Sequence, residues 1–172
     1  MPDAAGSFVN LFCLTGALAA ACRLAWRDIQ SRQVLDRELA WFAFFTALPR
    51  VLTYDGPAWA SPSLPLWAGQ LLDLARGCGG GLLLLALAVP GRLIPGRELI
   101  GGGDVLFALA AGFLLPGGAS LAMVCLAFFL ALPVSFFFLF VGRAEKPLPF
   151  IPFLALASLL LYCLPLPGFF TF

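Results

Sequence analysis

Six long apolar stretches, joined by short polar connections, limit what this chain can fold into. A helix needs about 20 apolar residues to cross a bilayer core, and fewer where neighbouring protein shields it. Apolar residues make up 62% of the chain and charged residues only 11%, whereas soluble domains carry roughly 25% charged residues. The sequence therefore predicts an all-α polytopic membrane protein, a single domain over residues 1–172. We expect about six transmembrane helices, at 8–26, 39–54, 68–90, 99–115, 119–141 and 150–164.

The first stretch could be mistaken for a cleaved signal peptide. A signal peptide carries its basic residues before the apolar run, but here Arg23 and Arg27 come at its end. We therefore expect this stretch to be a retained helix.

The third stretch has two features of its own. Asp73 and Arg76 stand three residues apart, a spacing that allows a local ion pair on one helix face. Four glycines lie between residues 77 and 81. They predict close packing against another helix, with a hinge as the alternative.

The absence of histidine excludes several kinds of catalytic site. Ser-His and Cys-His nucleophile pairs, the HExxH zinc site and imidazole-ligated metals all need an imidazole. The five cysteines stand singly, with no CxxC spacing that could hold zinc, and are best explained as small buried residues. A net charge of +1 provides no basic surface for nucleic acid. We expect no metal, no cofactor and no nucleic-acid partner.

The basic residues gather at alternate connections between the apolar stretches. Cytoplasmic loops of membrane proteins are enriched in Lys and Arg. The first, third and fifth connections are therefore predicted to face the cytoplasm, with both termini on the other side. These connections hold Arg23, Arg27, Arg32 and Arg37, then Arg92 and Arg97, then Arg143 and Lys146.

Two acidic residues on the predicted cytoplasmic side adjoin apolar runs. Asp28 follows the first run, and Asp104 precedes the run that begins at Val105. Ionisable side chains at membrane depth are costly and usually mark a functional site. The structural alternatives are neutralisation of Asp28 by Arg27 or Arg32, and a helix N-cap role for Asp104.

Three other acidic residues share the cytoplasmic side, namely Asp36, Glu38 and Glu98. They are most simply solvated loop charges. Alternatively, they attract basic residues of a substrate through the electrostatic field that they create.

The two aspartates together indicate a definite chemistry. If connections one and three bring their carboxyl groups close, both cannot ionise easily, so one stays protonated while the other acts as a base. Such a pair hydrolyses peptides, because the charged carboxylate activates water and the protonated one polarises the carbonyl. The helix dipole favours Asp104, at a helix N-terminus, as the base and Asp28 as the acid, and the alternative is the reverse order, imposed by Arg27 and Arg32. A coupled pair nevertheless titrates as a unit.

Three segments resemble elements of the type IV prepilin peptidases, which belong to the GxGD membrane aspartyl proteases. In the first segment, Asp28 is followed by a basic residue four positions later and then by a β-branched residue. The second segment resembles the GxGD element, with glycines directly before Asp104. The third segment resembles the family's PFGPFLA element. These segments are Asp28-Ile29-Gln30-Ser31-Arg32-Gln33-Val34, Gly101-Gly102-Gly103-Asp104-Val105 and Pro149-Phe150-Ile151-Pro152-Phe153-Leu154-Ala155.

The resemblance implies metal-free cleavage of prepilin or pseudopilin leader peptides at the cytoplasmic face of a bacterial inner membrane, with Asp28 and Asp104 as the catalytic pair. It implies supporting or substrate-binding roles for further residues of these segments and the nearby loop. The supporting residues are Gly101, Gly102, Gly103, Arg32, Arg97, Pro149, Phe150 and Pro152. The chain looks like the short peptidases of tight-adherence pilus systems, so no methyltransferase activity is expected.

The chain departs from the family pattern at three places. Leu106 stands where the family usually has Lys, and Arg97 or Arg92 could supply the missing cation. Ile151 replaces the usual Gly, and Val34 begins a segment that differs from the usual Ile-Pro-Asn. An alternative is therefore a divergent member that binds pilin without cutting it.

A small transporter is a third hypothesis, since intramembrane acids also mark ion pathways. It predicts related halves with interrupted helices in matching positions. The sequence contains no such repeat, so this hypothesis ranks last.

Overall fold

The computed structural model describes residues 4–32, 34–52, 66–93, 100–115, 119–141 and 148–164. Over these residues the chain folds into seven helices, as the all-α prediction requires. The helices are α1 (Ala4–Ser31), α2 (Asp36–Leu52), α3 (Leu66–Gly77), α4 (Gly79–Leu93), α5 (Gly102–Gly112), α6 (Ala119–Phe140) and α7 (Ile151–Cys163).

Two of the described helices are long and apolar enough to cross a membrane. They are Phe8–Ser31 within α1 and Ala119–Phe140, the whole of α6, and α3 with α4 would add a third crossing as one bent span. Helices α5 and α7 are apolar but have only 11 and 13 residues. At 1.5 Å per residue they cover roughly 16 and 20 Å of a core about 30 Å thick. The predicted spans at 99–115 and 150–164 correspond to these shorter helices.

The third predicted span consists of two helices. Helix α3 ends at Gly77 and α4 begins at Gly79, with a bend of 45° between them. Glycine is a poor helix former, so the chain breaks where glycines flank Cys78. The glycines also permit the predicted close packing, because a Cβ atom at Gly80 would overlap the backbone carbonyl of Ser120.

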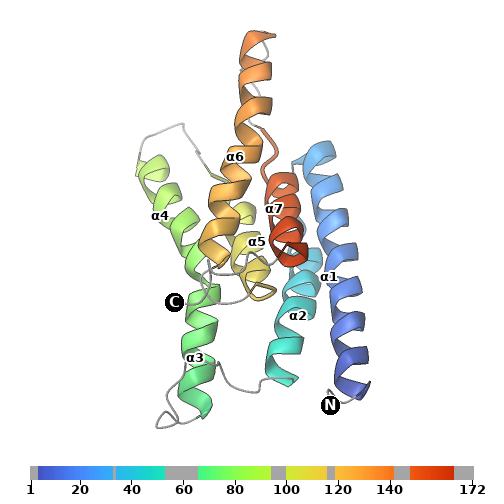
Figure 1. Cartoon of the computed structure of the whole chain (residues 1–172). Helices are drawn as coiled ribbons and strands as arrows, with labels where there is room; N and C mark the ends of the chain where they lie inside the picture. The colour runs from blue at the N-terminus through green and yellow to red at the C-terminus, as the bar shows by residue number, and fades with distance from the viewer. Residues whose placement is uncertain are drawn as a thin grey trace.

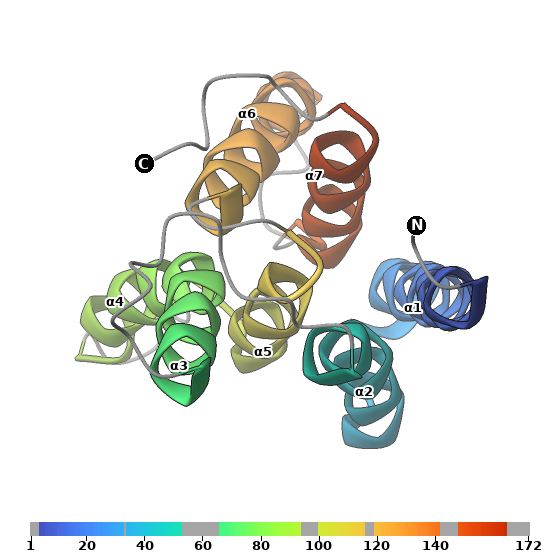
Figure 2. The same ribbon diagram turned by 60° about the horizontal axis from the view of Figure 1, so that its bottom comes forward.

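Helix α5 lies at the centre of the bundle and contacts α2, α4, α6 and α7 (Figure 2). Six of its 11 residues are buried, three of them alanines, and such small side chains let helices approach closely. Phe107 of α5 stacks on Phe42 of α2, with ring centroids 4.6 Å apart and an interplanar angle of 9°. These contacts fix the position of α5, whose first turn carries Asp104.

Arg50 of α2 forms an ion pair with α3 and hydrogen bonds with the backbone that follows α5. Arg50 binds the carboxylate of Asp73, donates from Nε to the carbonyl oxygen of Phe113 at 2.8 Å, and donates to that of Leu115. These carbonyls follow the last turn of α5, where a helix leaves acceptors without internal partners. The sequence indicated Arg76 as a local partner for Asp73 but gave no sign of Arg50, which lies 23 residues away.

The helix ends next to the three predicted cytoplasmic connections share one end of the bundle. In Figure 1 the C-terminal ends of α1, α4 and α6 and the N-terminal end of α7 all lie toward the top. The alternation of basic residues predicts this arrangement, because connections on one side of a membrane must meet at one end.

Candidate active site

A cavity of about 610 Å³ lies where the end of α1 meets the beginnings of α5 and α7. Its lining combines three carboxylates and one guanidinium group with apolar and glycine residues. The residues that line it are Asp28, Arg32, Val34, Asp36, Leu39, Ile100, Gly101, Gly102, Gly103, Asp104, Leu106, Phe128, Leu148, Pro149 and Phe150. Segments far apart in the sequence therefore share one cavity.

Asp28 lies in the last turn of α1 and is 7% exposed. Its Oδ2 accepts a hydrogen bond from the backbone N–H of Ile151, the first residue of α7, at 3.2 Å. The next residue, Pro152, has no N–H, and the N–H of Phe153 bonds to Phe150 at 3.1 Å. The carboxylate thus satisfies an N–H that the start of a helix leaves without an internal partner.

Asp104 occupies the first turn of α5, with its carboxylate turned back toward the helix start. The N-cap residue is Gly101, so the N-cap role considered for Asp104 is not observed. Instead, Asp104 Oδ2 accepts the backbone N–H of Gly101 at 3.2 Å. The residue is half-buried and lines the same cavity as Asp28.

The environments of the two carboxylates are more alike than the sequence indicated. Both expectations about helix position are met, since Asp28 ends α1 and Asp104 begins α5. However, Asp28 also meets the N-terminus of α7 through Ile151. Each carboxylate therefore accepts a backbone N–H at a helix start, and the dipole argument no longer separates an acid from a base.

The glycines before Asp104 allow a close approach at one position. A Cβ atom on Gly103 would lie 2.6 Å from Val34 Cγ2, so the turn after α1 packs directly on this residue. Gly101 and Gly102 are exposed and line the cavity.

The other predicted site residues divide into three groups. Arg32, Pro149 and Phe150 line the cavity, as does Leu106, which stands at the position of the family's Lys. Pro152 does not line it but lies in the first turn of α7. Arg97, like Glu98, lies outside the described residues.

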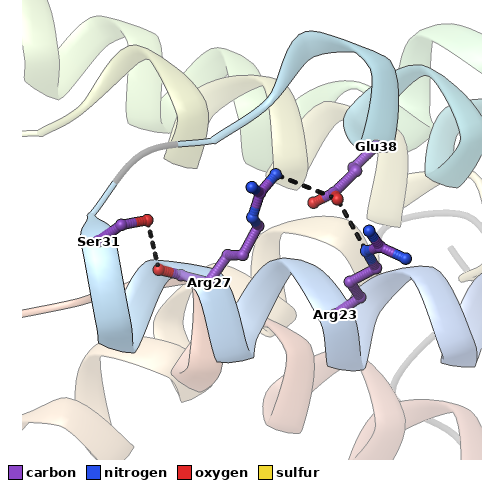
Figure 3. A network of polar contacts seen from close by, with 4 residues as sticks. All are labelled: Arg23, Arg27, Ser31 and Glu38. Carbon is purple, nitrogen blue, oxygen red and sulfur yellow. Dashed lines mark hydrogen bonds and ion pairs between the residues drawn. The ribbon is translucent and has the colours of Figure 1, made fainter.

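Glu38 is not the solvated loop charge that the sequence suggested. It lies in the first turn of α2, is 9% exposed, and its Oε1 accepts from Arg23 Nε at 2.7 Å and Arg27 Nη1 at 3.2 Å (Figure 3). Because Glu38 is buried next to two cations, it forms ion pairs with them and is not a solvated charge. Of the two arginines considered as neutralising partners of Asp28, Arg27 therefore pairs with Glu38 instead. The sequence did contain a signal for this pairing. Arg23 and Arg27 are one helical turn apart on α1, and Glu38 lies at the start of the next helix, α2.

The described residues contain no group of three or more Cys, Asp or Glu side chains placed to hold a metal ion. The chain matches no family model, and neither a curated protein nor a solved structure matches it. Any assignment of function therefore depends on the residues of the cavity and on the motif resemblance.

Proposed function

We propose that this chain is a membrane aspartyl endopeptidase that removes the N-terminal leader of prepilin-like or pseudopilin substrates. One observation supports this most strongly. The three segments that resemble the prepilin peptidases, separated by more than 40 residues in each case, contribute Asp28, Asp104 and Phe150 to a single cavity. Both carboxylates line this cavity, and acid–base hydrolysis of a peptide needs one group that donates and one that accepts a proton at the same site.

In the proposed reaction the two carboxyl groups share the proton transfers. One carboxylate takes a proton from a water molecule, whose oxygen attacks the scissile carbonyl carbon, while the other carboxyl group protonates the carbonyl oxygen. The tetrahedral intermediate then returns that proton as its carbonyl re-forms, the C–N bond breaks, and the amine nitrogen takes the proton removed from water. The dyad ends in its starting protonation state.

The substrate leader is proposed to carry basic residues, which an acidic site attracts. Of the three acids considered for this role, Asp36 lines the cavity and is exposed. Glu38 is already paired with two arginines, which removes it from the candidates. Asp36 is therefore the proposed contact for a basic leader residue.

The proposed location is the bacterial cytoplasmic membrane, with about six crossings and both termini outside. The shared end of the bundle, with the cavity and the arginines of α1, then faces the cytoplasm. Asp104 is half-buried in the first turn of α5, and the proposal expects water and the leader peptide to reach it from that side.

The test compares leader cleavage by the wild type with cleavage by Asp28→Asn and Asp104→Asn, using purified protein in lipid vesicles and a candidate prepilin. We expect each variant to lose at least about 100-fold in rate, because a positioned acid or base contributes 10²–10⁴-fold. Asp73→Asn is the matched control, since it removes a buried carboxylate that lies outside the cavity. It should lower stability but retain cleavage at temperatures where it stays folded. The proposal fails if both dyad variants cleave as well as the wild type.

Leu106 supports a second candidate function, that of a pilin-binding assembly factor without turnover. It lines the cavity where the family has a Lys and is 50% exposed. This candidate predicts that the wild type binds the leader peptide but does not cleave it, and that binding survives both Asn substitutions.

A further inference from the structure

Helices α1 and α2 lie side by side at the edge of the bundle (Figure 2), and a cluster of charges joins them. This charged cluster consists of Arg23, Arg27 and Glu38, and both arginines bind the same carboxylate oxygen of Glu38 (Figure 3). One carboxylate therefore faces two guanidinium groups, which leaves one positive charge unbalanced within the cluster. Neither arginine lines the cavity, so this charge lies outside the candidate active site.

The two arginines of the charged cluster remain accessible although they are paired. The side chain of Arg23 is 69% exposed and that of Arg27 is 38% exposed, whereas that of Glu38 is 9% exposed. An arginine carries five N–H donors, and the bonds to Glu38 use one from each arginine. The cluster therefore presents cationic donors on the outer surface of the bundle, with the acid beneath them.

Two exposed tryptophans indicate the depth of the charged cluster in a membrane that α1 spans. Trp26 lies one helical turn after Arg23 on α1, and Trp41 lies one turn after Glu38 on α2. Tryptophan side chains gather at membrane–water interfaces, and charged side chains exposed to hydrocarbon are costly. Both arguments place Arg23 and Arg27 at the level of the lipid headgroups.

A strip of aromatic side chains continues from the charged cluster along α1 and α2. The ring of Trp41 stacks on that of Phe45 with centroids 6.1 Å apart, and Phe45 meets Phe12 of α1 at 6.0 Å. Gly16 lets Phe45 lie against α1, because a Cβ atom there would come within 2.7 Å of the ring. From Arg23 to Phe12, α1 rises by roughly 16 Å, which matches half of a hydrocarbon core about 30 Å thick. The aromatic strip thus has the length of one lipid leaflet.

We infer that the charged cluster and the aromatic strip form a binding site for an anionic phospholipid. Its phosphate lies on Arg23 and Arg27, and one acyl chain lies along Trp41, Phe45 and Phe12. Guanidinium groups bind phosphates through paired charge-assisted hydrogen bonds. The unbalanced positive charge favours a lipid with a net negative charge, such as phosphatidylglycerol, over a zwitterionic one such as phosphatidylcholine.

The lipid belongs to the leaflet at the cavity end of the bundle, which is the cytoplasmic leaflet in the proposed topology. There it bridges α1 and α2 on their outer face. The inference requires that α1 spans a membrane, but it does not depend on the proposed peptidase function.

The test measures the quenching of tryptophan fluorescence by brominated phospholipids, with the protein in phosphatidylcholine vesicles. A background protein with Trp59→Phe and Trp67→Phe keeps Trp26 and Trp41, beside the site, as its tryptophans. A small fraction of the lipid is replaced by brominated phosphatidylglycerol in one series and by brominated phosphatidylcholine in the other. We expect phosphatidylglycerol to associate roughly five- to ten-fold more strongly.

Three variants of the background protein locate the binding site. Arg23→Gln removes the unbalanced charge and leaves Glu38 paired with Arg27, so it should stay folded and lower the preference to about two-fold or less. Arg27→Gln leaves Glu38 paired with Arg23 and should have the same effect. Arg37→Gln is the matched control, because it removes an equal charge from an exposed residue at the start of α2, and it should keep the preference.

Three outcomes would overturn the inference. The first is equal association of the two lipids with the background protein. The second is an equal loss of preference in Arg23→Gln and Arg37→Gln, because general surface charge would then attract the lipid. The third concerns free phosphate. Inorganic phosphate should displace phosphatidylglycerol no more than sodium chloride does at the same ionic strength, and a larger displacement would mean that the site binds free phosphate without an acyl chain.

Discussion

Gly112→Ala tests how tightly the central helix is packed. Gly112 ends α5, and a Cβ atom there would lie 2.9 Å from both the carbonyl carbon of Gly77 and Ser120 Oγ, and closer still to the Gly77 carbonyl oxygen. Two of these three atoms belong to backbone, so no side-chain rotation can relieve the overlap. Overpacking of this kind costs about 1–3 kcal/mol, while the better helix propensity of Ala returns at most about 1 kcal/mol. We expect a net loss of about 2 kcal/mol.

The matched control is Gly79→Ala, where the nearest atom to the new Cβ is Leu121 Cγ at an ordinary 3.5 Å. This variant should stay within about 0.5 kcal/mol of the wild type. The free energy of unfolding of all three proteins is measured in mixed micelles with increasing SDS. Since α5 carries Asp104, Gly112→Ala should also lower leader cleavage more than Gly79→Ala does. A Gly112→Ala protein as stable as the Gly79→Ala protein would refute the reasoning.

Two further substitutions test contacts that hold α5 in place. Arg50→Met leaves the buried carboxylate of Asp73 without this ion-pair partner and should cost about 3–5 kcal/mol of unfolding free energy. The double variant that adds Asp73→Leu should recover part of the loss; a double variant less stable than Arg50→Met would contradict this. Phe42→Ala removes the ring stacked on Phe107 in the core and should cost about 3–5 kcal/mol. Phe129→Ala, at a side chain 71% exposed on α6, should stay within about 0.5 kcal/mol in the same assay, and equal losses at the two positions would refute the assignment of the core.

Much of the candidate site could be predicted from the sequence because its signals are local. Asp28 and Asp104 stand out as acids beside apolar runs, and the alternation of basic residues predicts that their connections share one end of the bundle. The glycines of the third stretch likewise indicate close packing. Each signal depends on the properties of a few neighbouring residues, which tertiary contacts do not change.

The sequence did not predict which charged side chains form ion pairs with one another. Glu38 has the same composition around it as a solvated loop acid, yet it is buried against arginines 11 and 15 residues away. Asp73 is paired with Arg50 on another helix, and nothing in the sequence around either residue indicated this pair. Charge pairing depends on distance in space, and several pairings in the sequence satisfy the same spacing rules.

The amino-acid sequence by itself determined the helical class, the apolar character of the chain and the acids at the ends of its apolar runs, because burial in lipid and helix formation act on each segment separately. The tertiary structure decided which groups those acids meet. The N–H of Ile151 reaches Asp28 across 123 residues of sequence, and only the packing of α1 against α7 creates that contact. The cavity lined by Asp28, Arg32 and Asp104 arises in the same way, because the segments that form it lie far apart in the sequence.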